Sequence, residues 1–193
     1  MDPILIIILA IIVIAVIFVI GLYNGLVQRR LRIDEAFAQI EVQLKRRHDL
    51  IPNLVNTVKG SMEFEKETLE AVISARARAM SATTVGQTAA AEGALTGALG
   101  KFFAVAEAYP NLKSSTNIGS LQEELASTEN KISFARQAYN DMATKYNTKQ
   151  MQFPTNMVAG LAKATPAELW EITDDKEREV VNVDLSMGKK PTA

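Results

Sequence analysis

The chain has 193 residues, with 21 Lys and Arg against 22 Asp and Glu, one His and no Cys, and its formal net charge is −1. Without cysteine it forms no disulfide, no cysteine-based zinc site and no lipid-modified N-terminal cysteine. Every basic residue, and every acid except Asp2, follows residue 22, so the remainder is formally neutral, which argues against nucleic acid as a main partner.

The first predicted element is a transmembrane helix at residues 4–22. This stretch reads ILIIILAIIVIAVIFVIGL and contains no charged side chain. A helix of that length extends about 28 Å, which nearly matches the roughly 30 Å hydrocarbon core of a bilayer. A cleaved signal peptide would start with basic residues and end at a small-residue cleavage site. Here the run follows Met1-Asp2-Pro3, so we predict a retained anchor.

The charges that flank the anchor predict its orientation. No Lys or Arg precedes the apolar run, whereas Arg29, Arg30 and Arg32 follow it closely. Short basic segments are enriched on the cytoplasmic side of membrane helices. We therefore expect the N-terminus outside and the body, from residue 23 onwards, in the cytoplasm.

The first soluble helix continues the anchor without a helix-breaking residue. Positions spaced alternately three and four apart are mostly apolar, which is the pattern of a coiled-coil seam. We call five of these residues the first-helix seam: Leu26, Ile33, Phe37, Ile40 and Leu44. Further on, Pro52 lacks a backbone donor and predicts a kink or a short interruption.

Two further helices are predicted at 64–80 and 88–109, joined by a loop at 81–86. The second of them is rich in small residues and carries Gly93 and Gly97 on one stripe. Glycine costs about 1 kcal/mol against alanine inside a helix, so the stripe indicates close approach of a neighbouring helix. The same spacing is a membrane motif only within an apolar run. Charged residues in this helix favour tight packing in a soluble bundle instead.

The longest soluble helix is predicted at 118–153, because nine of eleven positions spaced alternately three and four apart are apolar or aromatic. Ile132 and Tyr139 are expected to face inward, and Pro154 ends the helix.

The predicted regions are a stub at 1–3, a transmembrane helix at 4–22, a helical bundle at 23–163 and a polar tail at 164–193, with an extended segment at 180–183 and disorder from 188.

The sequence carries little that points to catalysis. A single histidine and no cysteine exclude His–Cys metal sites and cysteine nucleophiles. Acidic residues cluster at 63–70 and 123–129, but the Glu-x-x-His pairs of a di-metal bundle are absent. We therefore expect no enzyme activity, no cofactor and no metal site. His48 is interpreted as a solvated or hydrogen-bonded helix residue.

Two polar features admit more than one interpretation. Lys45, Arg46 and Arg47 form a basic turn, which is either a solvated face that pairs with the acidic helices or a charge patch at an interface. The longest helix also carries polar residues, and each of them either faces solvent or is buried, where it would fix register or partner at some expense of stability. These residues are Asn130, Arg136, Gln137, Asn140 and Asn147.

Six stretches of the sequence carry a family resemblance: YNGLVQRR (23–30), EAFAQIEVQLKRRHDLIPNLVNTVKG (35–60), ETLEAVISARARA (67–79), GALGKFFAVAEAYPNLKSS (97–115), LQEELASTENKISFARQAYNDMATKYN (121–147) and FPTNMVAGLA (153–162). Together they resemble the LemA family of bacterial membrane proteins. The resemblance implies one N-terminal helix in the bacterial plasma membrane and a bundle of long antiparallel helices. It implies no catalytic residue, because the family has none established. Some relatives are associated with membrane remodelling in magnetosome-forming bacteria, and others lie beside membrane-bound metalloproteases.

The sequence therefore predicts an all-α protein, in which an N-terminal transmembrane helix continues into an antiparallel bundle of about four long helices with coiled-coil-like packing. We expect a self-associating scaffold that organises or remodels the membrane, in contact with lipid and with copies of itself. The expected self-association residues are Gly21, Gly25 and the first-helix seam, since the short second helix would leave the seam uncovered near the membrane. The alternative is a regulatory adaptor for another membrane protein, such as a metalloprotease. An unrecognised hydrolase is a weaker third hypothesis.

Overall fold

The computed structural model describes residues 2–59, 65–113 and 115–171. Within these ranges the chain forms four long helices, α1 (Pro3–Lys59), α2 (Lys66–Ser81), α3 (Val85–Glu107) and α5 (Thr116–Met151), and two short ones, α4 (Pro110–Lys113) and α6 (Thr155–Ala159). No strand occurs in the same ranges, so the predicted all-α fold is confirmed. The extended segment and the disorder predicted beyond residue 179 lie outside the described residues.

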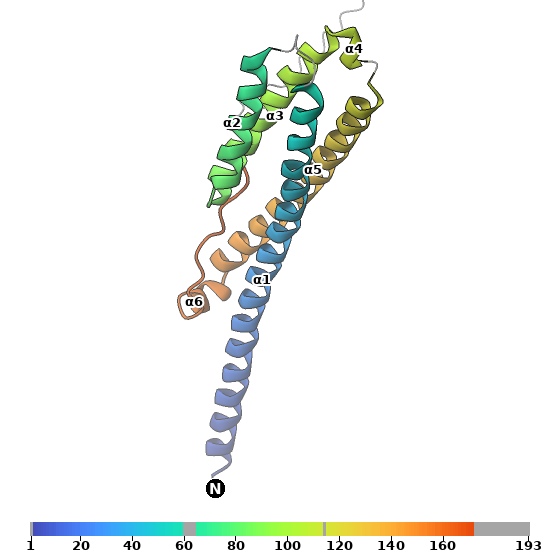
Figure 1. Ribbon diagram of the computed structural model, residues 1–193. Coiled ribbons are helices and arrows are strands. Elements are labelled where there is room, and N and C mark those ends of the chain that lie inside the picture. The colour runs from blue at the N-terminus through green and yellow to red at the C-terminus, as the bar shows by residue number, and fades with distance from the viewer. Residues whose placement is uncertain (1, 60–64, 114, 172–193) are drawn as a thin grey trace, which may run out of the picture.

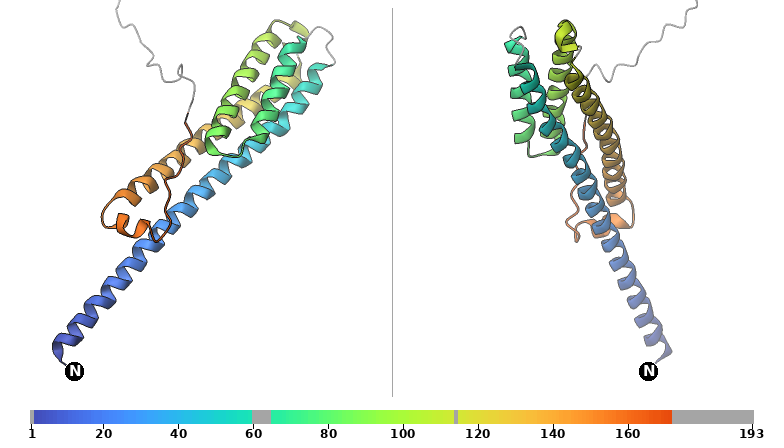
Figure 2. Two further views of the ribbon diagram at one scale, coloured as in Figure 1. Left: turned by 90° about the vertical axis from the view of Figure 1, so that its left-hand side faces the viewer. Right: turned by 45° about the vertical axis from the view of Figure 1, so that its right-hand side comes forward.

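The long helices alternate in direction and pack as two antiparallel pairs (Figure 1). α1 lies along α5, and α2 lies along α3. α4 lies at the end of the body farthest from the N-terminus, and α6 is the body element nearest the N-terminal part of α1 (Figure 2). The body is therefore an elongated bundle from which the start of α1 projects.

The projecting part of α1 is the apolar run. Its residues from Ile4 to Ile20 are exposed, and an eighteen-residue window of the helix has a mean hydropathy of 3.7 with none of it buried. By length and composition α1 is able to cross a membrane. The predicted membrane span and the first helix of the body thus belong to one helix.

α1 passes Pro52 without the interruption that was one of the two predicted outcomes. A proline inside a helix removes a hydrogen bond and clashes with the preceding turn, at a cost of about 3 kcal/mol. Packing outweighs this cost, because Ile51 and Leu54 are at most 1% exposed. Full burial of each such side chain stabilises the fold by about 1.5–3 kcal/mol.

The first-helix seam is buried inside the body. All of its residues except Phe37 are at most 5% exposed, and the Phe37 ring lies 5.7 Å from the Tyr139 ring of α5. The expectation of an uncovered seam is therefore wrong. The expectation assumed that the short α2 was the helix beside the seam. The helix beside it is α5, whose 36 residues extend about 54 Å along α1.

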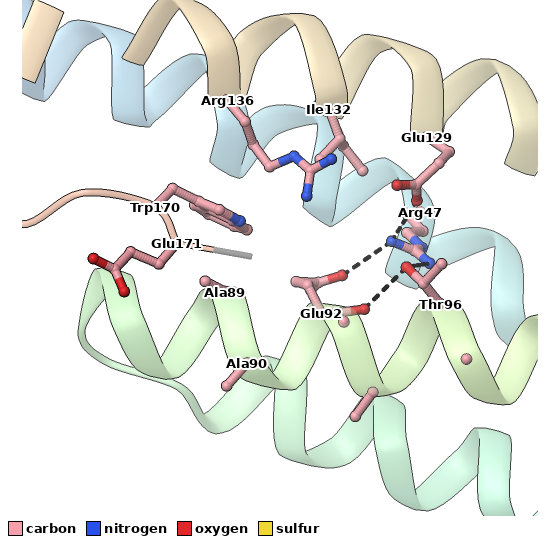
Figure 3. A pocket seen from close by; sticks show the side chains of 13 residues that line it. Arg47, Ala89, Ala90, Glu92, Thr96, Glu129, Ile132, Arg136, Trp170 and Glu171 are labelled. Carbon is pink, nitrogen blue, oxygen red and sulfur yellow. Dashed lines mark hydrogen bonds and ion pairs between the residues drawn. The ribbon is translucent and has the colours of Figure 1, made fainter. Parts of the chain in front are cut away.

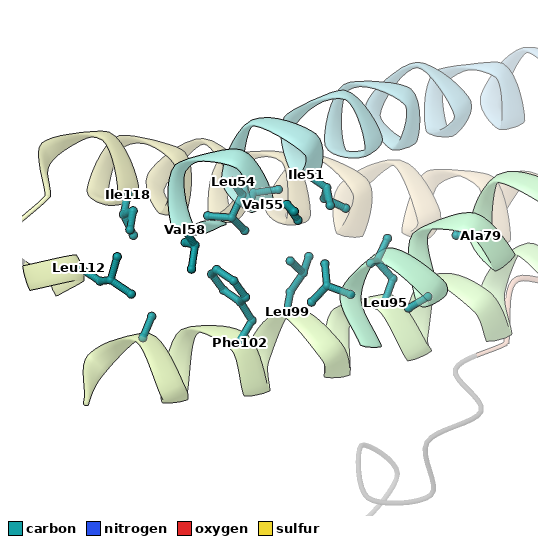
Figure 4. Close-up of a cluster of buried hydrophobic side chains, with 14 residues drawn as sticks. Ile51, Leu54, Val55, Val58, Ala79, Leu95, Leu99, Phe102, Leu112 and Ile118 are labelled. Carbon is teal, nitrogen blue, oxygen red and sulfur yellow. The ribbon is translucent and has the colours of Figure 1, made fainter. Parts of the chain in front are cut away.

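A second apolar core lies at the end of the body far from the apolar run (Figure 4). Val58 of α1, Val72 of α2 and Phe102 of α3 are fully buried there. Leu112 of α4 and Ile118 of α5 belong to the same cluster. This core therefore joins the α1–α5 pair to the α2–α3 pair.

The inward face of α5 starts as predicted and then shifts by one residue. Ile132 and Tyr139 are both 2% exposed, which confirms that prediction. Near the end of the helix, however, Met142 is 38% exposed and Ala143 is fully buried. A helix with 3.6 residues per turn drifts about 20° per heptad against a strict 3.5-residue repeat. The alternating pattern therefore loses register after several turns.

Candidate functional site

A buried charged cluster joins three helices (Figure 3). Arg47 of α1 lies between two carboxylates, with its Nη1 3.3 Å from Glu92 Oε2 on α3 and 2.8 Å from Glu129 Oε2 on α5. Its Nη2 donates to Thr96 Oγ1 at 2.7 Å. The Arg47 and Glu92 side chains are each 4% exposed. A guanidinium suits this position, because its fixed fork of donors serves several acceptors at once.

His48 approaches the same carboxylate from the next position of α1. Its Nε2 lies 2.6 Å from Glu92 Oε1, within hydrogen-bond distance. His48 is 8% exposed, so it is hydrogen-bonded rather than solvated. Both Glu92 oxygens are engaged, one by Arg47 and one by His48. No group of three or more metal-binding side chains occurs within the described ranges.

A groove of about 460 Å³ lies between α3 and α5 beside the charged cluster. Arg136 of α5 extends into it, with Trp170 nearby (Figure 3), and no described residue forms an ion pair with Arg136. Seven residues of α3 line the groove: Glu92, Thr96 and five small residues, namely Ala89, Ala90, Gly93, Ala94 and Gly97. The groove therefore combines a side made largely of Ala and Gly with one cation, Arg136, that forms no ion pair within the described residues.

The glycine stripe of α3 lines this groove, and no described helix packs closely against the side where the glycines lack a Cβ. A Cβ added at Gly93 or Gly97 would meet no heavy atom within 4 Å. The predicted close approach of another helix is therefore wrong for the described part of the chain. The missing side chains widen the groove instead.

Two asparagines of α5 hold residues 164–171, the docked segment, against the body. Asn147 donates to the Ala167 carbonyl at 2.9 Å and accepts from the Ala167 N–H at 2.7 Å. Asn140 forms the same pair of bonds with Trp170, at 2.9 and 2.8 Å. Seven helical residues rise about 10.5 Å and three extended residues span about 10 Å. The two spacings therefore match, and each side-chain amide pairs with one backbone unit.

The docked segment also reaches α3. Glu168 accepts from the Gly86 N–H at 3.1 Å in the first turn of α3, where a carboxylate is favoured by the helix dipole. The Glu168 carbonyl accepts from the Tyr139 hydroxyl at 2.6 Å. Burial raises the pKa of the Tyr139 phenol above its ordinary value. Trp170 is only 3% exposed. Residues that the sequence assigned to a polar tail thus tie the two helix pairs together.

The predicted basic patch does not form one surface. Arg47 faces inward, whereas Lys45 and Arg46 are exposed. Lys45 donates to Asp49 at 2.7 Å, and this hydrogen bond holds the pKa of the Asp49 carboxyl below its ordinary value. Arg46 pairs with Glu124 of α5 at 3.2 Å. The geometry favours the interpretation in which this turn pairs with acidic residues.

The predicted self-association residues fall into two groups. The first-helix seam is occupied by contacts within the chain. Gly21 and Gly25 are open, because a Cβ added at either would meet no heavy atom within 4 Å. They lie where α1 leaves the apolar run, so the face of α1 that carries these two glycines is free to contact another helix.

Comparisons with known proteins show which family this sequence matches. A model of the LemA family matches residues 36–185. The protein named LemA from Metamycoplasma hominis is 29% identical over 175 residues, which cover 88% of this chain and 76% of that protein. The family match includes the charged cluster, the groove and the docked segment.

Proposed function

This chain belongs to the LemA family, and from that premise we propose that it is a membrane-anchored, non-enzymatic helical scaffold that organises or remodels the bacterial plasma membrane. One observation carries the proposal. α1 contains both the apolar run and a row of core residues from Leu26 to Val58. A rotation or clustering of the body is therefore transmitted directly to the part of α1 in the bilayer.

The contacts of the charged cluster support a structural role for it. Glu92 would be the natural general base, but both of its oxygens are already bonded, to Arg47 and to His48. A base must have an oxygen within hydrogen-bond reach of the proton that it removes. The cluster is suited to fixing the register of three helices, since each helix contributes a charged group.

In this proposal, copies of the scaffold contact each other at the face of α1 that carries Gly21 and Gly25. Gly21 and Gly25 are four residues apart and unobstructed, and such spacing lets two membrane helices approach closely. The tether also raises the local concentration of identical helices. The first-helix seam takes no part, because α5 covers it.

The test is the size of the full-length protein in mild detergent, with chemical crosslinking in native membranes. We expect an oligomer for the unmodified chain and a monomer for the double variant Gly21→Leu, Gly25→Leu. Gly100→Leu is the matched control, because Gly100 is equally open but lies in α3. A monomeric unmodified protein at micromolar concentration would rule out the scaffold.

The groove supports the alternative, a regulatory adaptor that binds another membrane protein such as a metalloprotease. The Ala and Gly residues on its α3 side leave room for an apolar segment of a partner, beside the Arg136 side chain. A photo-crosslinking residue at Gly93 tests this in membranes, with one at exposed Glu123 as the control. Specific crosslinks to a different protein, without oligomers of this chain, would favour the adaptor.

A further inference from the structure

An apolar corner closes the end of the body that lies nearest the apolar run. It comprises residues 150–162, which run from the end of α5 through α6 to the turn that follows, and we call it the α6 corner. Four of its side chains, Met151, Phe153, Met157 and Leu161, are each at least 70% exposed. Phe153, Met157 and Leu161 recur every four residues, whereas Thr155 and Val158 between them are buried. The corner therefore buries one face and presents an apolar face outward.

The α6 corner lies beside the point where α1 leaves the apolar run. Ala159 and Ala162 pack against the core cluster that contains Leu26 of α1, and α6 is the body element nearest the apolar run in both figures (Figures 1 and 2). Leu26 follows Leu22, the last residue of that run, by roughly 6 Å of helix rise. The exposed apolar face is therefore level with the expected membrane surface.

The charges around the α6 corner follow the pattern of a membrane interface. Residues 150–162 contain no charged side chain, and Lys149 and Lys163 bracket them. Lys149, Lys145 and Arg29 line one shallow surface hollow, and no carboxylate of the described residues lines it with them. Basic residues next to an apolar segment attract anionic lipid headgroups, while the apolar side chains enter the acyl boundary.

We propose that the α6 corner is a second membrane contact, which inserts Phe153, Met157 and Leu161 into the bilayer interface while Arg29, Lys145 and Lys149 bind anionic headgroups. The inference rests on the proposed anchoring of α1. Two contacts, the anchor and the corner, fix the tilt and the rotation of the bundle relative to the membrane, which one helix alone would leave free. Continuity with the anchor favours lipid over a second copy of the chain as the occupant of this face.

Depth-dependent fluorescence quenching tests the proposal on the full-length protein. The chain has no cysteine, so Met157→Cys carries a single environment-sensitive fluorophore. Phe134→Cys is the matched control, because Phe134 is 74% exposed but lies about 25 Å along α5 from Met151. Ile14→Cys, within the apolar run, reports on the anchor. Each labelled protein is reconstituted in vesicles of phosphatidylcholine and phosphatidylglycerol, with and without spin-labelled lipid.

We expect the Met157 probe to emit at shorter wavelength and to lose most of its fluorescence to the spin-labelled lipid, as the Ile14 probe does, while the Phe134 probe keeps its fluorescence. Lys145→Gln with Lys149→Gln should reduce the quenching at Met157, and so should vesicles without phosphatidylglycerol. A quenched Ile14 probe with a Met157 probe that behaves like Phe134 would overturn this inference and leave the anchor intact. A Met157 probe that is shielded but unquenched would assign the face to a protein contact. Failure of the Ile14 probe to be quenched would overturn the anchor and this inference together.

Discussion

The Nε of Arg76 donates a 2.8 Å hydrogen bond to the backbone carbonyl of His48, and His48 is the residue four positions before Pro52. In an α-helix that carbonyl accepts from the N–H of residue 52, which proline lacks. α2 therefore supplies from its own side chain the donor that is missing inside α1. This contact explains how α1 continues past a proline without leaving a carbonyl unpaired.

The first prediction follows from that contact. Arg76→Ala should lower the free energy of unfolding by about 1–3 kcal/mol, because the His48 carbonyl is left without a donor. In a Pro52→Ala background the loss should be smaller, since the new N–H of residue 52 bonds that carbonyl. Chemical denaturation of the full-length protein in mild detergent, followed by circular dichroism, measures the four stabilities of this double-mutant cycle.

Arg78→Ala is the control for this cycle. Arg78 lies on the same helix and is exposed, so its removal should leave stability nearly unchanged. Equal losses from Arg76→Ala with and without Pro52 would mean that the hydrogen bond to His48 does not compensate for the proline.

The second prediction concerns the charged cluster. Arg47→Met should destabilise the fold by about 3 kcal/mol, the lower end of the range for breaking a buried ion pair. Glu92 loses its cation inside the protein, whereas Glu129 is 36% exposed and partly solvated. Lys45→Met is the control, because its ion pair with Asp49 is exposed at both ends and contributes little. Thermal unfolding that shifts equally for both variants would contradict the structural role of Arg47.

The third prediction uses the one tryptophan of the chain as a reporter of the docked segment. Trp170 is 3% exposed, so its emission should lie at short wavelength and resist quenching by acrylamide. Asn140→Ala with Asn147→Ala removes four hydrogen bonds to the segment. We expect a shift to longer wavelength and stronger quenching. Asn130→Ala, at an exposed position of the same helix, should change neither, and unchanged emission in the double variant would refute the docking.

Local pattern was sufficient to predict the helices but not their partners. The apolar run and the periodic residues of α5, including Ile132 and Tyr139, follow from side-chain spacing alone, and the helix bounds agree within a few residues. Which helix covers the first-helix seam depends on how the chain folds back. The seam is covered not by α2, the next helix along the chain, but by α5, which antiparallel packing brings beside α1.

The charged cluster and the docked segment show the same limit. Arg47 and Glu92 are 45 residues apart, and nothing in the local sequence of either distinguishes a buried ion pair from two solvated charges. Asn140 and Asn147 did carry a signal, since a spacing of seven places both on the same side of the helix, toward one partner. Their partner is an extended backbone rather than a helix. The spacing of apolar residues does not predict a contact of that kind.

The fourth prediction is a pH dependence. Burial raises the pKa of Tyr139 above its ordinary value near 10, so the folded state holds the phenol proton more tightly than the unfolded state does. The resulting stabilisation is complete below that unfolded value and is lost as the pH rises through the higher folded pKa. Tyr139→Phe should cost about 0.5–1.5 kcal/mol at neutral pH, because the Glu168 carbonyl loses its donor. The difference from the unmodified protein should shrink in alkaline solution, and a difference that stays constant up to pH ~11 would contradict the assignment.

The last prediction places the body in the cytoplasm. Arg29, Arg30 and Arg32 follow the apolar run in sequence, and basic residues close to a membrane helix are retained on the cytoplasmic side. Ser120→Cys provides a single thiol at an exposed position of α5, near the end of the body far from the apolar run. In intact cells this thiol should resist a membrane-impermeant maleimide, and after lysis it should react fully. A periplasmic protein with one exposed cysteine, labelled in the same cells, establishes that the reagent has crossed any outer membrane. Labelling of Ser120→Cys in intact cells to the level of that periplasmic protein would reverse the orientation, because the body would then lie outside.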